Sequence, residues 1–312
     1  MTNTTKLRFP VLALLAVAAA SGQVIDFDKD RLIRYTAANP FERFPDGRPK
    51  VPDSLLEKLE GMSAEEMLAL NQRGFRNQFE GGWQILKPGK ILVGRAFTVQ
   101  LMPSRPDVAG VAQADWGGKH SGRLTHQTTL DMLQPGDVLV ADAAGVQFGG
   151  IIGDNLAYYI MKKTGTGFVI DGAIRDLRGI APFDMTGYFR AAVPPAIHDL
   201  MVGGINVPVR IGGATVMPGD VVFGDPEGVY FIPPAHVEDL VDDAEVTHIH
   251  DDWTKRKFDE GKYVSTDIYY TPRDPALREE YDKHLKEKLG AERYEKYRKR
   301  RQAPPTPARR QQ

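Results

Sequence analysis

Residues 153–176, GDNLAYYIMKKTGTGFVIDGAIRD, decide the fold because they predict a helix that is followed at once by a buried strand. Asp154 has a side chain that commonly caps a helix N-terminus. Leu156 and Ile160 would share the face of this helix that packs on the core. Gly165 predicts the end of the helix, since glycine readily adopts the left-handed conformation found there. A helix interleaved with strands is typical of an α/β fold.

The strand that follows this helix leads to a charged segment. The apolar run 168–170 predicts a short buried strand. We expect Asp171-Gly172 to turn the chain and to place Arg175 and Asp176 just beyond the strand. Loops at strand ends usually carry the polar chemistry of α/β proteins. Arg175 and Asp176 could therefore be a carboxylate clamp next to a metal ligand, or a plain structural ion pair.

Composition narrows the classes of protein that the chain can be. Its 312 residues are 42% hydrophobic and 26% charged, which suffices for one large or two smaller domains with a sizeable core. The formal net charge of −1 gives no electrostatic basis for binding nucleic acid or an anionic membrane. Without cysteine the chain has no disulfide, thiolate metal site, cysteine nucleophile or lipidated cysteine.

The N-terminus has the pattern of a signal peptide over residues 1–22. Lys6 and Arg8 precede the apolar run 10–20, which ends in small residues. The run is too short for a comfortable membrane span. We therefore expect an exported, periplasmic protein without a membrane span after cleavage. The alternative is a buried or uncleaved N-terminal helix.

Three regions are expected after this leader. Residues 23–80 form an N-terminal extension, in which Ser63 and Glu66 predict a capping box at a helix start. Residues 81–240 mix strand and helix patterns and predict one layered α/β domain. Residues 241–312 predict a charged helical extension, because opposite charges recur at helical spacing. The strand candidates are residues 91–93, 96–99, 138–140, 168–170, 207–209, 221–223 and 229–232.

Several ordered motifs between about Gly81 and Val237 resemble the signature of the RraA-like family. That family includes metal-dependent 4-hydroxy-4-methyl-2-oxoglutarate/4-carboxy-4-hydroxy-2-oxoadipate aldolases. The resemblance covers about half of the chain and implies an α/β/β/α swivelling-type layered domain. It also implies homotrimers or hexamers with sites at subunit interfaces. The motifs are Gly153-Asp154-Asn155-Leu156, Gly165-x-Gly167, Asp171-Gly172-x-x-Arg175-Asp176, Gly94-Arg95-Ala96, Pro135-Gly136-Asp137, Met217-Pro218-Gly219-Asp220 and Gly224-Asp225-x-x-Gly228-Val229.

The same resemblance implies roles for the residues of the first motif. Asp176 would be the direct protein ligand of Mg²⁺ or Mn²⁺, with waters completing the coordination. Arg175 would clamp the carboxylate of a small 2-oxo acid substrate, which suits the planar guanidinium. The segment Gly153, Asp154, Asn155 and Leu156 would bind substrate at a helix start. Asp154 could equally be a plain helix cap.

The function implied by the resemblance is that of a divalent-metal-dependent lyase, a class II aldolase. It would cleave 4-hydroxy-2-oxo acids to pyruvate, with oxaloacetate decarboxylation as a side activity. The alternative is a non-catalytic binding or regulatory protein, because the family also contains inhibitors that bind a ribonuclease complex. A third alternative is an exported enzyme of the same fold with another substrate.

The acidic residue that completes the site is left open by the sequence. The aldolases of this family use an acidic residue near the C-terminus of an adjacent subunit, for which Glu245, Asp251 and Asp252 are the candidates. His248 and His250 lie beside two of these acids, so the segment could also be a separate zinc or iron site.

Five further residues have less specific assignments. Arg95 is either another anion contact or a surface residue. His120 and His126 flank a glycine-rich loop that either recognises substrate or is a flexible turn. Lys162 and Lys163 are expected on the solvated side of a helix, so we assign neither of them a Schiff-base role.

Overall fold

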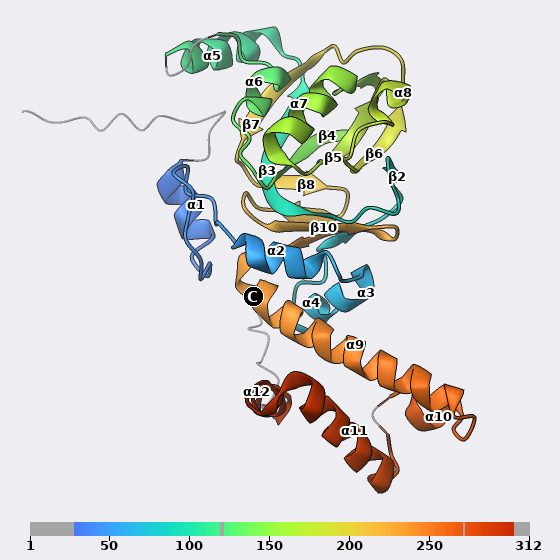
Figure 1. The fold of residues 1–312 in the computed structure, drawn as a ribbon. Coiled ribbons are helices and arrows are strands. Elements are labelled where there is room, and N and C mark those ends of the chain that lie inside the picture. Colours follow the sequence, from blue (N-terminus) through green and yellow to red (C-terminus); the bar gives the residue numbers. More distant parts are fainter. Residues whose placement is uncertain (1–27, 119–121, 271, 303–312) are drawn as a thin grey trace, which may run out of the picture.

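A curled, mixed sheet of nine strands forms the centre of the molecule, and helices lie above and below it in Figure 1. The computed structural model describes residues 28–118, 122–270 and 272–302, so the predicted signal peptide lies outside the described residues. The nine strands are β1 (Phe79–Glu80), β2 (Gln84–Ile85), β3 (Leu92–Pro103), β4 (Asp137–Gly150), β5 (Phe168–Ile174), β6 (Gly187–Ala192), β7 (Leu200–Ile205), β10 (Val221–Asp225) and β11 (Gly228–Ile232).

The order of the strands shows that the sheet curls strongly. It runs β1-β11-β10-β3-β4-β5-β6-β2, with β7 paired to β3 beside this path. Strands β3 to β6 are parallel neighbours, and the remaining pairs are antiparallel. β1 and β2 lie at opposite ends of the order, yet only residues 81–83 join them. The two ends of the sheet are therefore held close together.

The inner face of the curled sheet packs around a separate hairpin of β8 (Val209–Ile211) and β9 (Ala214–Val216). Side chains alternate along β3 as strand geometry requires. Leu92 and Ala96 belong to the inner cluster, whereas Phe97 and Val99 belong to a cluster on the outer face.

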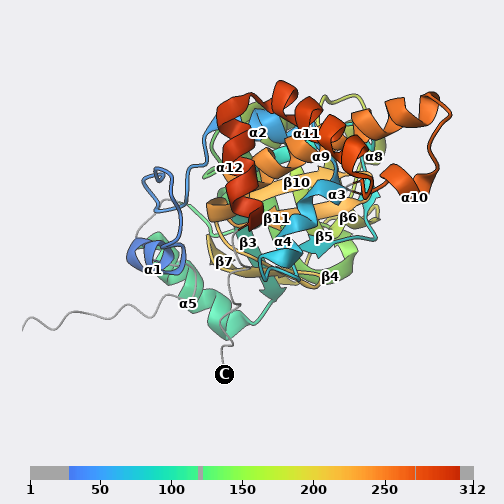
Figure 2. The same cartoon turned by 90° about the horizontal axis from the view of Figure 1, so that it is seen from below.

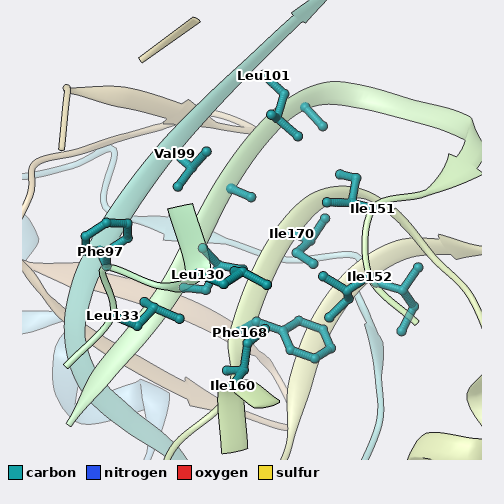
Figure 3. Packing of buried hydrophobic residues seen from close by; sticks show 14 of the residues in the cluster. Phe97, Val99, Leu101, Leu130, Leu133, Ile151, Ile152, Ile160, Phe168 and Ile170 are labelled. Atoms are coloured by element: carbon teal, nitrogen blue, oxygen red, sulfur yellow. The ribbon is translucent and has the colours of Figure 1, made fainter. Parts of the chain in front are cut away.

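Helices cover the outer face of the sheet in two groups. One group is α5 (Pro106–Gly117), α6 (His126–Leu130), α7 (Asp154–Thr164) and α8 (Leu177–Ile180), which pack over β3 to β6. Figure 3 shows Leu130 of α6 and Ile160 of α7 among the strand side chains of this cluster. The other is α2 (Asp53–Leu59), α3 (Ala64–Met67), α4 (Ala69–Gln72) and α9 (Val237–Asp259), which pack over β10 and β11. The helix α1 (Lys29–Tyr35) precedes them, and the 3-10 turn η1 (Pro234–His236) leads into α9.

The C-terminal helices form a cluster of their own. They are α10 (Ser265–Ile268), α11 (Pro275–Leu289) and α12 (Ala291–Gln302). Trp253 of α9 packs on Tyr281 of α11, with 5.1 Å between the ring centroids. In Figure 2 the helices α11 and α12 lie in front of α9. Arg300 pairs with Asp239 at 3.0 Å, so basic residues of the last helix meet acids of α9. No helix in the described ranges combines the length and the apolar character of a membrane span.

Most of the predicted elements are present. The capping box at Ser63 and the helix end at Gly165, with φ of 73°, are confirmed. The strand candidates 138–140, 168–170, 221–223 and 229–232 lie in β4, β5, β10 and β11. The runs 91–93 and 96–99 belong to the single strand β3, and the candidate at 207–209 reaches β8 only at its last residue.

Two local predictions are wrong. Asp154 is the first residue of α7 and Gly153 is its N-cap, so the Asp154 carboxylate is not the cap. Asp171-Gly172 is not a turn but part of β5, which continues to Ile174. Gly172 fits there because an added Cβ would lie only 3.0 Å from the Cβ of Ala143 on β4. The chain thus leaves the sheet four residues later than expected, directly at Arg175.

A buried ion pair ties the N-terminal segment to the sheet. Arg48 Nη1 and Nη2 donate to the two carboxylate oxygens of Asp137 at 2.8 and 3.1 Å, and both side chains are fully buried. The N–H of Gln134 donates to the same carboxylate at 2.9 Å. Residues near 50 therefore pack as part of the α/β domain, although the sequence suggested an extension up to residue 80.

Removing one partner of this pair should destabilise the fold strongly. Arg48→Met leaves the Asp137 carboxylate buried without its cation, and we expect the free energy of unfolding to fall by about 3–5 kcal/mol. The double variant Arg48→Met/Asp137→Leu should recover most of that loss, because no buried charge remains. Urea unfolding of the two variants measures both values. A single variant as stable as the wild type would contradict the assigned pairing.

The Asp220 carboxyl predicts a pH dependence of stability. Burial raises the pKa of Asp220 to about 7 from its usual 3.8, although an N–H donated by Met217 at 2.8 Å opposes this. The folded chain therefore holds a proton that the unfolded chain releases above about pH 4. The stability that this bound proton contributes to the folded chain is fully present below about pH 4 and is lost as the pH rises through 7. In Asp220→Asn this component should vanish, so the wild type should lose stability relative to the variant across that window. A constant difference between the two would contradict the raised pKa.

Candidate functional site

A cavity of about 230 Å³ lies where the start of α7 meets the turn between β5 and α8. Gly153 to Leu156 and Arg175, which were predicted to bind substrate, all line it, so the structure brings this part of the predicted site together. Asp176, the predicted metal ligand, does not line the cavity but follows Arg175 directly. Of the other lining residues, the sequence singled out only His126. The cavity is lined by His126, Gln127, Gly150, Ile151, Gly153, Asp154, Asn155, Leu156, Arg175, Ala196 and Ile197.

Arg175 and Asp176 occupy the turn directly after β5. Arg175 Nη1 lies 3.3 Å from Asp176 Oδ2, and both side chains are more than one third exposed. Asp176 has a φ of 60°, a left-handed conformation that is uncommon outside glycine. It is the N-cap of α8, yet its side chain makes no capping hydrogen bond. The backbone of Asp176 is thus in an unusual conformation, and its carboxylate is not occupied by capping the helix.

Two glycines allow the chain before α7 to lie directly against this turn, and a third allows it to approach the opposite wall of the cavity. A Cβ added at Gly150 would come within 2.7 Å of the Arg175 Cβ, and one at Gly153 would collide with the Asp176 carboxylate. A Cβ at Gly149 would lie 2.8 Å from the Cα of Ile197 on the opposite wall. The position of Arg175 is fixed further by its N–H, which donates to the carbonyl of Ile152 at 2.9 Å.

The N-terminal end of α7 faces the cavity. Because the first N–H groups of a helix lack helical partners, this end of α7 favours anions. Asp154 Oδ1 accepts the N–H of Asn155 at 2.8 Å, and Gly179 of α8 packs directly against the Asp154 side chain. Asp154 therefore joins α7 to α8 in addition to lining the cavity.

His126 begins α6 on another wall of the cavity. Thr125 caps this short helix by accepting the N–H of Thr128, and the His126 carbonyl accepts the Thr129 hydroxyl at 2.7 Å. Burial lowers the pKa of the His126 imidazole, which keeps the ring neutral at pH 7. His120, the other histidine of the predicted loop, lies outside the described residues.

The Asp176 carboxylate beside the cavity fits a hard divalent cation. In the ranges that the structure describes, no three His, Cys, Asp or Glu side chains gather as a metal site. A cation here would rely on the Asp176 carboxylate, with water as its other ligands. Mg²⁺ and Mn²⁺ suit such a site, because they prefer oxygen ligands and Mg²⁺ keeps several waters. A structural zinc site would require about four protein ligands.

Arg95 lies outside the cavity, and both predictions for it are wrong. It is neither an anion contact nor a surface residue, since only 2% of it is exposed. Its Nε donates to the carbonyl of Val51 at 2.7 Å, and it pairs with Asp53. Lys162 and Lys163 do not line the cavity either.

The candidate acids near the C-terminus also lie away from this cavity. Glu245, Asp251 and Asp252 are all on α9 and none of them lines it. Because the resemblance places such an acid on an adjacent subunit, its role stays a prediction. His248 pairs with Glu66, whereas the His250 ring packs on Tyr281 with 5.3 Å between centroids. The two rings therefore have different partners and do not converge.

Comparisons with known proteins agree on one family. Residues 52–231 match the family model RraA-like, described as Aldolase/RraA. A Halalkalibacterium halodurans protein named "Putative 4-hydroxy-4-methyl-2-oxoglutarate aldolase" is 35% identical over 122 residues, which are 39% of this chain and 58% of that protein. The chain thus aligns with little more than half of that relative. An Ectopseudomonas mendocina protein of the same name is 29% identical over 153 residues, covering 44% of this chain and 94% of that protein.

Solved structures show the same architecture. The crystal structure of Streptomyces coelicolor RraAS2, titled an unusual member of the RNase ES inhibitor RraA protein family, has a TM-score of 0.57 and 29% identity. The match covers 69% of this chain and all of that one. An uncharacterized Pseudomonas syringae protein has a TM-score of 0.59 at 22% identity, covering 72% and 94% of the two chains, and shows the fold alone.

The close packing at Gly153 can be tested by adding one methyl group. Gly153→Ala should push the Asp176 carboxylate and the Arg175 side chain out of their positions, and because both side chains are partly exposed we expect the free energy of unfolding to fall by no more than about 1 kcal/mol. Gly110→Ala is the matched control, because its added Cβ meets no atom within 4 Å on the exposed side of α5. Urea unfolding should show no loss for the control. Equal stability of the two variants would contradict the contact between Gly153 and Asp176.

Proposed function

The chain belongs to the RraA-like family, and from this premise we propose that it is a divalent-metal-dependent lyase. It cleaves 4-hydroxy-2-oxo acids, of which 4-hydroxy-4-methyl-2-oxoglutarate is the model substrate, into pyruvate and a second carbonyl compound. The names of the relatives support this reaction class. The observation that carries the proposal is that Arg175 and the start of α7 line one cavity, with the Asp176 carboxylate 3.3 Å from the Arg175 guanidinium.

The geometry supports the binding of a 2-oxo acid in this cavity. The guanidinium of Arg175 can hold the carboxylate through two parallel hydrogen bonds. The N-terminus of α7, at Gly153 to Leu156, adds backbone donors and a favourable dipole for the same anion. At about 230 Å³ the cavity is smaller than those that hold drug-sized ligands, which suits a small acid.

The reaction also needs stabilisation of negative charge on the 2-oxo oxygen. Breaking the bond between C3 and C4 leaves an enolate of pyruvate, in cleavage of a 4-hydroxy-2-oxo acid and in decarboxylation of oxaloacetate alike. A Mg²⁺ or Mn²⁺ ion held by Asp176 would supply Lewis-acid stabilisation of that charge. Arg175 holds the neighbouring carboxylate and prevents it from turning away. Oxaloacetate decarboxylation is therefore proposed as a side activity of the same site.

Further features complete the proposal. The α/β domain is an α/β/β/α swivelling-type domain, and it assembles into trimers or hexamers with the cavity near a subunit interface. Glu245, Asp251 and Asp252 are the candidates for an acid supplied by a neighbouring subunit. The leader over residues 1–22 directs the chain to the periplasm.

A regulatory binding protein is the second candidate function. The full-length structural match to RraAS2, whose title places it in an RNase inhibitor family, favours it. A regulator would keep the fold and bind a protein partner without turning over a small acid. Catalytic turnover therefore separates the two candidates.

Pyruvate release tests the proposed lyase. The chain without its leader should form pyruvate from 4-hydroxy-4-methyl-2-oxoglutarate and from oxaloacetate with Mg²⁺ or Mn²⁺, and EDTA should abolish both activities. Asp176→Asn should lower kcat/KM by at least about 100-fold, the scale expected for lost charge stabilisation. Asp184→Asn changes an exposed carboxylate outside the cavity and serves as the matched control.

Two results would contradict the proposal. Turnover that persists in EDTA would remove the metal from the mechanism. A folded chain without turnover of either substrate, under any of these conditions, would favour the regulatory candidate instead.

A further inference from the structure

One wall of the cavity is lined by polar residues that have no role in the proposed binding of the 2-oxo acid. His126 and Gln127, both from α6, line the same cavity as Arg175. Figure 1 shows α6 on one side of α7 and α8, which follows Arg175, on the other side. Because Arg175 and His126 line one cavity, a substrate whose carboxylate binds Arg175 can extend toward α6. In that orientation the end that reaches α6 is C4, which carries the hydroxyl group.

Cleavage of a 4-hydroxy-2-oxo acid requires a proton acceptor at that end. As the bond between C3 and C4 breaks, the hydroxyl proton must leave so that C4–O can become a carbonyl. The electron pair of the broken bond moves to C3 and forms the pyruvate enolate. A base placed at the hydroxyl contributes typically 10²–10⁴-fold to the rate of such a step.

We infer that His126 is the general base that takes the proton from the C4 hydroxyl of the substrate. The inference rests on the proposed lyase function and adds a catalytic residue to it. Nε2 or Nδ1 of the imidazole accepts the proton, and the imidazolium then returns it to C3 of the enolate. The protons and electrons balance, with pyruvate and the second carbonyl compound as the products.

The environment of His126 suits this role. Since burial lowers the pKa of the ring, the imidazole is in its proton-accepting form at pH 7. The capped helix α6 fixes the backbone at this position through Thr125 and Thr128. Among the described residues Asp154 also lines the cavity, with its Oδ1 accepting the N–H of Asn155 at 2.8 Å and its side chain packed on Gly179 of α8.

A nearby histidine provides the matched comparison. His198 lies one residue beyond Ile197 but does not line the cavity itself. Its ring is 62% exposed and contacts Asp199 at 2.7 Å, with Phe148 packed at 5.2 Å between ring centroids. This pair resembles a base with its orienting carboxylate, so His198 is the rival for the same role.

The two lyase substrates separate a base from a structural residue. Decarboxylation of oxaloacetate breaks the corresponding C3–C4 bond but releases CO₂, so no hydroxyl proton has to be removed. The enolate then takes its proton at C3 from solvent. Loss of a general base should therefore slow the aldol cleavage selectively.

His126→Gln is the direct test, because glutamine keeps a polar side chain but cannot take up the proton. We expect kcat for 4-hydroxy-4-methyl-2-oxoglutarate to fall by about 100-fold or more. Oxaloacetate decarboxylation and the Kd for pyruvate, measured by calorimetry with Mg²⁺, should stay close to the wild-type values. His126→Asn should give the same selective loss, and His198→Gln should retain both activities.

Three outcomes would overturn the inference. Equal losses for both substrates would make His126 a structural residue, and no loss for either would leave the proton to another acceptor. A selective loss in His198→Gln would assign the role to the rival. A wild-type chain inactive on both substrates would instead refute the proposed function, which is a distinguishable result.

Discussion

The site depends on the direct contact between the end of β4 and the turn that follows β5. This contact requires glycine at Gly150, because an added Cβ there would lie 2.8 Å from the backbone N of Arg175, and at Gly153 an added Cβ would meet the Asp176 carboxylate. Hydrogen bonds from Ile151 N to Ala173 O, at 2.8 Å, and from Arg175 N to Ile152 O, at 2.9 Å, hold the two segments together. The arginine, the aspartate and the start of α7 are therefore fixed relative to one another by backbone rather than by flexible side chains. Such preorganisation is what binding of a small anion needs.

The sheet supports this contact from beneath, and the N-terminal segment supports the sheet. β4 and β5 are parallel neighbours in the middle of the sheet, so both strands end at the same edge of it. Two buried arginines join residues before the first sheet strand to β3 and β4. Arg48 binds Asp137 at the start of β4, and Arg95 of β3 binds the carbonyl of Val51. The match to the family from residue 52 onward agrees with this packing. The segment is thus a structural part of the domain that carries the site.

Local patterns were sufficient to predict the elements around the site but not every contact between them. The helix at 154–164 and the strand from Phe168 follow from glycine positions and apolar runs, whereas the gathering of Gly153 with Arg175 was implied by the family resemblance. The strand end at Ile174 could not be predicted, because Asp171-Gly172 has the composition of a turn, whereas pairing with β4 keeps both residues in the sheet. Arg95 was misassigned for a similar reason, since its partners lie more than 40 residues away. The capping pattern of Thr125 and Thr128 predicts the start of α6, but only the fold places His126 in the cavity.

The central claim is that Arg175, Asp176 and the start of α7 bind a 2-oxo acid together with a divalent cation. Oxalate tests it most directly, because it resembles the planar enolate of pyruvate and analogues of high-energy states bind more tightly than substrates. Calorimetric titration of oxalate should give strong binding with Mg²⁺ or Mn²⁺, and the binding should be lost in EDTA and in Asp176→Asn. Oxalate binding of equal strength with and without the cation, or no binding to the folded chain, would contradict the account.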